Sequence, residues 1–217
     1  TEKLEGFLRS FEDEDVHGQT VKKYIELLQS VANRSERVVE IELDDVYSHF
    51  GGDEMADKIR KNTYRYKQLI ADAIDKCMPA PVGEMAEPDV ADVLHNSRMR
   101  GSENAAPVDS SDPNQLPPGL KRRYEVRVLP RTKEKALPLR KVRVSSIGHL
   151  LTVKGIVTRV SEVKPNISIA TYTCQKGGTE VYQEVMKRDF MPLFTCPSEG
   201  CCGATGRLHL QTRGCKF

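Results

Sequence analysis

The sequence has 217 residues, of which 38% are hydrophobic and 29% are charged. This length and polarity fit one large or two small folded domains, and they exclude collagen, a disulfide-rich mini-protein and wholesale disorder. The apolar runs are far shorter than the roughly 20 residues that a membrane-spanning helix needs, and no signal-peptide pattern is present.

The net charge of +2 conceals an uneven distribution. Residues 1–120 sum to −10, residues 121–217 sum to +12, and residues 121–164 alone carry +10. This division predicts an acidic module joined to a basic one, and basic modules often bind nucleic acid. The alternative is that the two halves attract each other.

The acidic half is predicted to be mostly helical. Apolar residues recur at helical spacing over residues 21–31 and 55–77, and a third helix is expected at 89–100. Between the first two, residues 37–43 alternate apolar and acidic side chains, which is the period of a strand. We interpret the apolar stripes as faces that pack against one another in a core.

The basic half has the period of β-strands and follows a linker rich in Gly, Asn, Asp and Pro. Strands are expected at residues 124–128, 150–160, 167–173 and 207–211. Gly155 interrupts the second of these strands and suggests the bulge or bend that a small barrel needs. The chain is therefore predicted to be an α+β protein with a helical N-terminal domain and a small antiparallel barrel or sheet.

Five of the six cysteines follow residue 170. Clustered cysteines without a secretory signal favour a metal site over a disulfide framework. Cys196 and Cys201 form one good knuckle for a structural zinc ion. Cys174 opens another knuckle, but Gly177 stands where a second cysteine would complete it. Three ligands are therefore clear from the sequence.

The fourth ligand has three candidates, which are Cys202, His209 and Cys215. Cys202 adjoins Cys201, and neighbouring side chains of an extended chain point apart unless a turn intervenes. Water in the fourth position would give a catalytic type of site, but no base is placed to use it. A metal-free remnant and a thiol or zinc enzyme remain alternatives. The predicted zinc ligands are Cys174, Cys196, Cys201 and Cys202.

Several long motifs follow one another in the chain. They are His149–Pro165, Ala170–Cys174, Phe194–Ser198 and Leu210–Phe217, with support from Asn62–Tyr66. Together these motifs resemble the signature of the minichromosome maintenance (MCM) family. The resemblance covers essentially the whole chain and is strongest from residue 121 onward.

The resemblance implies a multidomain α+β architecture. Residues 1–110 would form a helical subdomain, followed by a linker at 111–120. An incomplete oligonucleotide/oligosaccharide-binding (OB) barrel would occupy residues 121–173 and 206–217, with a zinc-ribbon-like hairpin inserted at 174–205. The family's ATPase motor, with its ATP and magnesium, would lie outside these residues. The sequence contains no phosphate-binding loop, so this chain alone is not expected to hydrolyse ATP.

The resemblance also implies a function. The chain would belong to the N-terminal tier of a replicative DNA helicase, which organises a hexamer and a double hexamer around DNA. Its expected partners are other MCM subunits, DNA, and replication loading and activation factors, in the nucleus and without a membrane. The alternative is a free-standing single-stranded nucleic-acid-binding OB protein with a zinc ribbon.

The predicted nucleic-acid contacts come from two sources. Arg122 and Arg123 begin a run of nine cations that ends at Arg143, and such a run suits phosphate contacts without sequence preference. Some of these cations are instead expected to pair with acidic residues. The resemblance adds residues that match the family's single-strand-binding motif, namely Arg159, Lys164, Arg213, Lys216 and Phe217. Phe217 suits base stacking, and barrel core is its alternative role.

Overall fold

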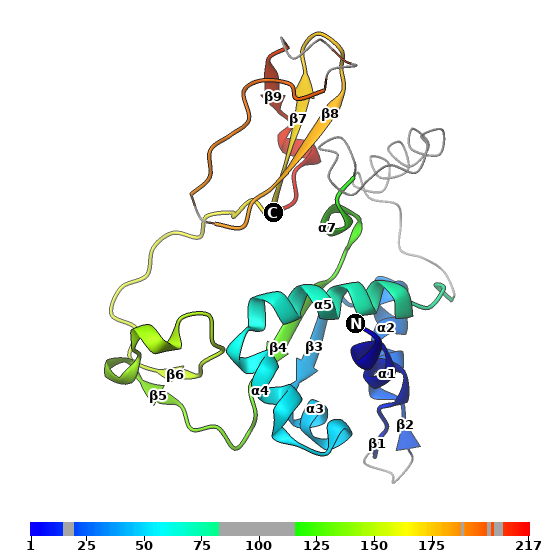
Figure 1. Cartoon of the computed structure of the whole chain (residues 1–217), viewed down its shortest axis with the longest axis vertical. Coiled ribbons are helices and arrows are strands. Elements are labelled where there is room, and N and C mark those ends of the chain that lie inside the picture. The colour runs from blue at the N-terminus through cyan, green and yellow to red at the C-terminus, as the bar shows by residue number, and fades with distance from the viewer. Residues whose placement is uncertain (15–19, 83–115, 188, 199–200, 202–205) are drawn as a thin grey trace. The chain divides into compact units, whose positions relative to one another are not determined.

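The computed structural model describes residues 1–14, 20–82, 116–187, 189–198, 201 and 206–217 (Figure 1). The chain divides into two compact units, one comprising residues 1–86 and 124–160 and the other residues 87–123 and 161–217. Each unit is described by itself. The predicted helix at 89–100 and the first half of the predicted linker lie outside the described residues.

The first unit surrounds a two-stranded sheet with helices. Its helices are α1 (Glu2–Ser10), α2 (Lys23–Ala32), α3 (Leu43–Phe50), α4 (Asp53–Lys61) and α5 (Thr63–Cys77). Its strands are β1 (Asp13–Glu14), β2 (Thr20–Val21), β3 (Val38–Glu42), β4 (Glu125–Leu129), β5 (Leu137–Pro138) and β6 (Val153–Lys154). Among the described residues, no helix has the length and apolar character needed to cross a bilayer.

The predicted helix at 55–77 is two helices in the structure. The break falls at Asn62, whose backbone φ of −141° and ψ of 55° are not helical. The hydroxyl of Thr63 donates to the carbonyl oxygens of Ile59 and Arg60, at 2.9 and 3.2 Å, at the end of α4. Polar side chains that bond to nearby backbone in this way compete with a continuous helix.

The strands predicted at 37–43 and 124–128 both form, as β3 and β4. They pair in parallel, with Val39 opposite Val126 and Ile41 opposite Val128. The antiparallel arrangement expected for the second strand is therefore wrong. The pairing brings the apolar faces of both strands into one core, and Figure 1 shows α5 running across the pair.

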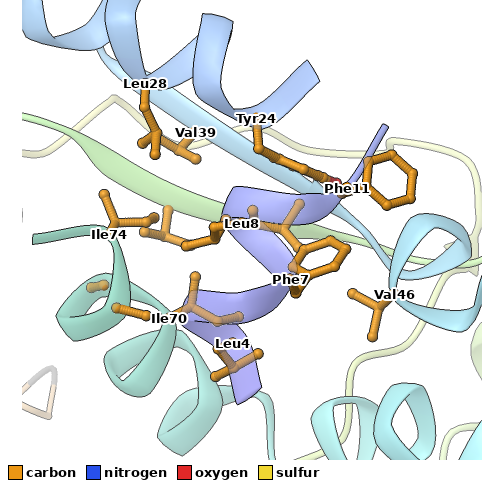
Figure 2. Close-up of a cluster of buried hydrophobic side chains, with 14 of the residues drawn as sticks. Leu4, Phe7, Leu8, Phe11, Tyr24, Leu28, Val39, Val46, Ile70 and Ile74 are labelled. Atoms are coloured by element: carbon orange, nitrogen blue, oxygen red, sulfur yellow. The ribbon is translucent and has the colours of Figure 1, made fainter. Parts of the chain in front are cut away.

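The core of the first unit gathers α1, α2, β3 and α5. Phe7 and Leu8 of α1 lie between Tyr24, Val39 and the α5 residues, as Figure 2 shows. The aromatic ring of Phe7 lies 4.9 Å from that of Tyr24. Each large side chain buried in this way contributes roughly 1.5–3 kcal/mol relative to an exposed one. The buried members at the centre are Leu4, Phe7, Leu8, Tyr24, Leu28, Val39, Ile41, Ile70 and Ile74.

The strand predicted at 150–160 is only partly present. β6 pairs in parallel with β5, and two short 3-10 helices, η1 (Leu139–Lys141) and η2 (Val144–Ser146), lie between them in the chain. Residues 155–160 form no strand. Ile156 is 91% exposed and Val157 78% exposed. A strand needs a partner to satisfy its backbone groups, and no described segment pairs with these residues.

The second unit is built on a three-stranded antiparallel sheet. Its elements are α7 (Pro118–Lys121), β7 (Ile169–Cys174), β8 (Glu180–Glu184), β9 (Leu208–Leu210) and η3 (Thr212–Gly214), with the strand order β8-β7-β9. Tyr172, Val181 and Leu208 form its core with Ala170. The strands predicted at 167–173 and 207–211 are confirmed. The described strands form separate small sheets and do not close a barrel.

Candidate metal centre and nucleic-acid interface

Three cysteine sulfurs converge beyond the end of β7. The Sγ atoms of Cys174, Cys196 and Cys201 all lie within 4.8 Å of one another. Cys174 and Cys196 are buried, and Cys201 is half-buried. A tetrahedral zinc ion with Zn–S bonds of about 2.3 Å holds its sulfurs about 3.8 Å apart. The three thiols therefore lie close enough together to bind one metal ion.

Backbone hydrogen bonds hold the cysteines in place. The amide of Cys174 donates to Thr179 at 3.0 Å, and the amide of Gly178 donates back to Cys174 at 2.9 Å. Gly178 has a φ of 69°, a left-handed conformation that glycine adopts at little cost. The amide of Cys196 donates to Gly206 at 3.0 Å. A tight turn after Cys174 and the pairing of Cys196 with Gly206 thus help to place the thiols near one another.

The structure brings together three of the four predicted ligands, while Cys202 lies outside the described residues. The other two candidates for the fourth ligand are placed elsewhere. His209 is exposed on β9, opposite Thr173. The Cys215 thiol accepts from the Thr171 amide at 3.4 Å and donates to Gln211 at 3.2 Å. Among the described residues, neither belongs to the cysteine group.

A set of exposed cations lies within residues 140–159 of the first unit. Its members are Arg140, Lys141, Arg143, Lys154 and Arg159. Within the described residues they make no ion pair, and no aspartate or glutamate occurs between Glu134 and Glu162. We call these five residues the basic segment. Their charge is available to an external anion.

Other cations of the predicted run are paired internally. The guanidinium of Arg131 binds Asp44 and Asp53 and lies 4.1 Å from the ring of Tyr47. Arg127 lies 3.5 Å from Glu125. The expectation that some of the run pairs with acidic residues is therefore confirmed, and Arg131 in particular is a structural residue.

Asp44 anchors the segment that follows β4. One of its oxygens accepts the Thr132 amide at 2.9 Å and the Thr132 hydroxyl at 2.8 Å. These hydrogen bonds, with the Arg131 guanidinium beside them, lower the pKa of the Asp44 carboxyl. These contacts hold the chain just after β4 against α3, ahead of the basic segment.

The predicted nucleic-acid residues lie in both units. Arg159 belongs to the first unit, and the other six belong to the second. Lys164, Arg213 and Phe217 are exposed. The Lys216 ammonium donates to the carbonyl oxygens of Gly119 and Arg122, at 2.7 and 2.9 Å. Lys216 would have to break these bonds to contact a phosphate.

Comparison with known protein families accounts for nearly all of the chain. The MCM N-terminal domain matches residues 1–129, and the MCM OB domain matches residues 138–217. The chain belongs to the MCM family. Several eukaryotic relatives of the chain are named MCM7.

Curated relatives agree with this assignment of the MCM chain. DNA replication licensing factor MCM7 of Oryza sativa subsp. indica is 44% identical over 90% of the chain, and that of Xenopus tropicalis is 41% identical over all of it. Licensing factor mcm6 of Schizosaccharomyces pombe is 27% identical over 92% of the chain. The chain spans 27% and 30% of the length of the first two relatives.

Sequence reasoning missed Lys154 as a member of the MCM chain's basic segment. A usable signal was present, because residues 135–161 contain no acidic side chain. The run of cations predicted from their density ends at Arg143. Counting the acid-free stretch, rather than the density of cations, would have added Lys154 to the predicted contacts.

Proposed function

We propose that this chain is the N-terminal DNA-binding and assembly tier of a replicative helicase subunit in the nucleus. The observation that carries the proposal is the basic segment, exposed and unpaired within the described residues, in a chain of the MCM family. The names of the relatives, DNA replication licensing factors, favour this function over a free-standing single-strand binder.

The basic segment suits binding to a nucleic-acid backbone. Guanidinium and ammonium groups neutralise phosphates without reading bases, and such binding weakens as salt rises. A ring that moves along DNA needs contacts of this kind, because contacts that depend on sequence would hold it at particular sites. Within the second unit, Lys164, Arg213 and Phe217 are proposed as separate nucleic-acid contacts.

Exposed apolar residues support the assembly role. Val144, Ile147, Val160 and Val163 are between 76% and 99% exposed. We infer that a partner chain covers these side chains, because several strongly exposed apolar residues follow one another along the chain. We assign that contact to other MCM subunits, in a hexamer and a double hexamer, with loading and activation factors as further partners.

The cysteine group supports a zinc ion in a ribbon-like hairpin. Zinc would be held by Cys174, Cys196 and Cys201. Its role there would be structural, because it would link the segments that carry these cysteines. Cys202, the fourth ligand predicted from the sequence, lies outside the described residues, so the described site has three ligands. No catalytic residue is proposed in this chain, and ATP would act only in the motor of the whole protein.

The test is a salt titration of single-stranded DNA affinity, with the chain in its MCM complex. Replacing Arg159 and Lys164 by alanine should weaken binding and lower the salt slope by roughly 0.7 for each phosphate that is no longer neutralised. A variant with Lys58→Ala and Lys76→Ala removes the same charge from ion pairs on helix surfaces, and it should match the wild type. An unchanged affinity and slope in the first variant would contradict the proposed contacts.

A further inference from the structure

Gly177 occupies the point where the first turn comes closest to the cysteine group. A β-carbon built on Gly177 would lie 2.1 Å from the Sγ atom of Cys201 and 3.1 Å from its carbonyl oxygen. Real β-carbons essentially never approach another heavy atom so closely. The sulfur of Cys201 therefore fills the place that any side chain at position 177 would take.

The turn that follows Cys174 therefore supplies only one sulfur, that of Cys174 itself. Gly177 has no donor side chain, while Cys174 at the start of the same turn is buried in the cluster. Gly177 itself is exposed and Cys201 is half-buried, so the group faces solvent on this side. Among the described residues, no other histidine, cysteine or carboxylate joins the three thiols.

We propose that Gly177 leaves this metal site with three protein thiolates and a fourth position filled by a small exchangeable ligand from solution. The inference rests on the proposed zinc binding and concerns its coordination. Zinc in proteins is almost always four-coordinate, and a site with three protein ligands completes its shell with water or another small donor. Three soft thiolates select thiophilic divalent ions such as Zn²⁺, Co²⁺ and Cd²⁺.

The proposal gives position 177 a specific role. Its residue decides whether the metal is enclosed by protein or open to exchange. The sulfur of Cys201 is the end of a short side chain, so it can rotate aside if a side chain appears at 177. A cysteine introduced there would then close the site with a fourth thiolate.

The experiment is a cobalt titration of the 217-residue chain, reduced with a phosphine rather than a thiol. Charge-transfer absorbance counts the thiolates on each Co²⁺ ion, and added imidazole shifts the visible bands only if a position is open. The wild type should show three thiolates and respond to imidazole. Gly177→Cys should raise the charge-transfer absorbance by about one third and abolish the imidazole response.

Matched variants separate the alternatives. Gly177→Ala adds the β-carbon without a sulfur, so it should not raise the charge-transfer absorbance and should still respond to imidazole. Cys215→Ser and Cys202→Ser should also leave it unchanged, whereas Cys196→Ser should remove about one third of the absorbance. A loss of about one quarter in Cys202→Ser, with no imidazole response in the wild type, would overturn the open position and leave the zinc proposal intact. A wild-type chain that binds neither Co²⁺ nor Zn²⁺ would overturn both.

Discussion

Two neighbouring carboxylates at the start of α3 organise the polar contacts of the first unit. Asp45 accepts the hydroxyl of buried Tyr24 at 2.7 Å and the ammonium of Lys23 at 2.8 Å. Asp44 accepts three groups from Arg131 and Thr132. Asp45 thus links α2 to α3, and Asp44 links the segment after β4 to the same helix.

Removing the Tyr24 hydroxyl should measurably destabilise the fold. The side chain is fully buried, and its hydroxyl also accepts the Glu42 amide at 3.4 Å. We expect Tyr24→Phe to lower the free energy of unfolding by about 1–2 kcal/mol in a urea titration, because a buried hydrogen bond to a charged group is removed. Tyr64→Phe, at an exposed position of α5, should leave the unfolding midpoint unchanged.

Tyr24 also makes a prediction at alkaline pH. Burial, and then the carboxylate of Asp45, raise the pKa of the Tyr24 phenol above its ordinary value of 10.0. The unfolded chain therefore loses the phenolic proton first as pH rises, so stability should fall above about pH 10. Following unfolding between pH 9 and pH 11 by denaturant titration, Tyr24→Phe should lose part of this slope and Tyr64→Phe should retain all of it. Equal slopes in both variants would contradict the assignment.

Asp44 makes the opposite prediction at acid pH. Because its pKa is lowered in the folded chain, the stability it contributes is present above the ordinary carboxyl pKa of about 3.9 and is lost as pH falls below it. Asp44→Asn should therefore flatten the fall in stability below pH 4. Glu26→Gln, an exposed carboxylate on α2, is the control and should keep the wild-type profile.

At the scale of elements, local periodicity predicted α2, β3, β4, β7 and β9. α1 and α3 were missed, although Leu4, Phe7, Leu8 and Phe11 have helical spacing and could have indicated α1. The parallel pairing of β3 with β4 could not be predicted, because it joins Val38 to Glu125 across a large part of the chain. Side-chain alternation gives the buried face of a strand but not its partner.

The cysteine site, too, could be predicted from the sequence only in part. Spacing alone predicted that Cys174, Cys196 and Cys201 would converge, since knuckle ligands recur at fixed intervals. The close approach of Gly177 to Cys201 could not be predicted, because it depends on how two turns meet in space. The absence of a cysteine at 177 is visible in the sequence, but its steric consequence is visible only in the structure.

The sheet of the second unit should survive removal of the metal. Five residue pairs join β7 to β8, and the buried side chains of Tyr172 and Val181 belong to one apolar cluster on these strands. We expect a chelator to leave β7 and β8 amides protected in hydrogen exchange, while the amides of Cys196 and Cys201 lose protection. Exchange of the β7 amides at the rate of an unfolded chain would show instead that the metal holds the whole sheet.

At the scale of the whole molecule, charge and apolar exposure coincide. The basic segment shares residues 139–160 with Val144, Ile147, Ile156, Val157 and Val160, all strongly exposed. A surface that is both cationic and apolar suits a subunit that contacts DNA and protein neighbours at once. Residues 155–160 form no strand because no described segment pairs with them.

Assembly should therefore raise the hydrogen-exchange protection of this segment more than that of any helix of the first unit. We expect the amides of residues 155–163 to exchange rapidly in the isolated chain and to gain protection when other MCM subunits are added. The amides in the middle of α5 should exchange at the same rate in both states, because they already lie in the core. Rapid exchange of residues 155–163 in the complex would exclude them from the subunit interface.

The mass of the particles formed with the corresponding chains of other MCM subunits tests the proposed function most directly. If this chain is a tier of a helicase ring, light scattering should show it leaving the 24.4 kDa monomer and entering a heteromeric complex. The complex should bind single-stranded DNA with an affinity that falls as salt rises. A chain that stays monomeric in the presence of those partners and binds DNA equally well alone would contradict the assembly role and favour a free-standing binder.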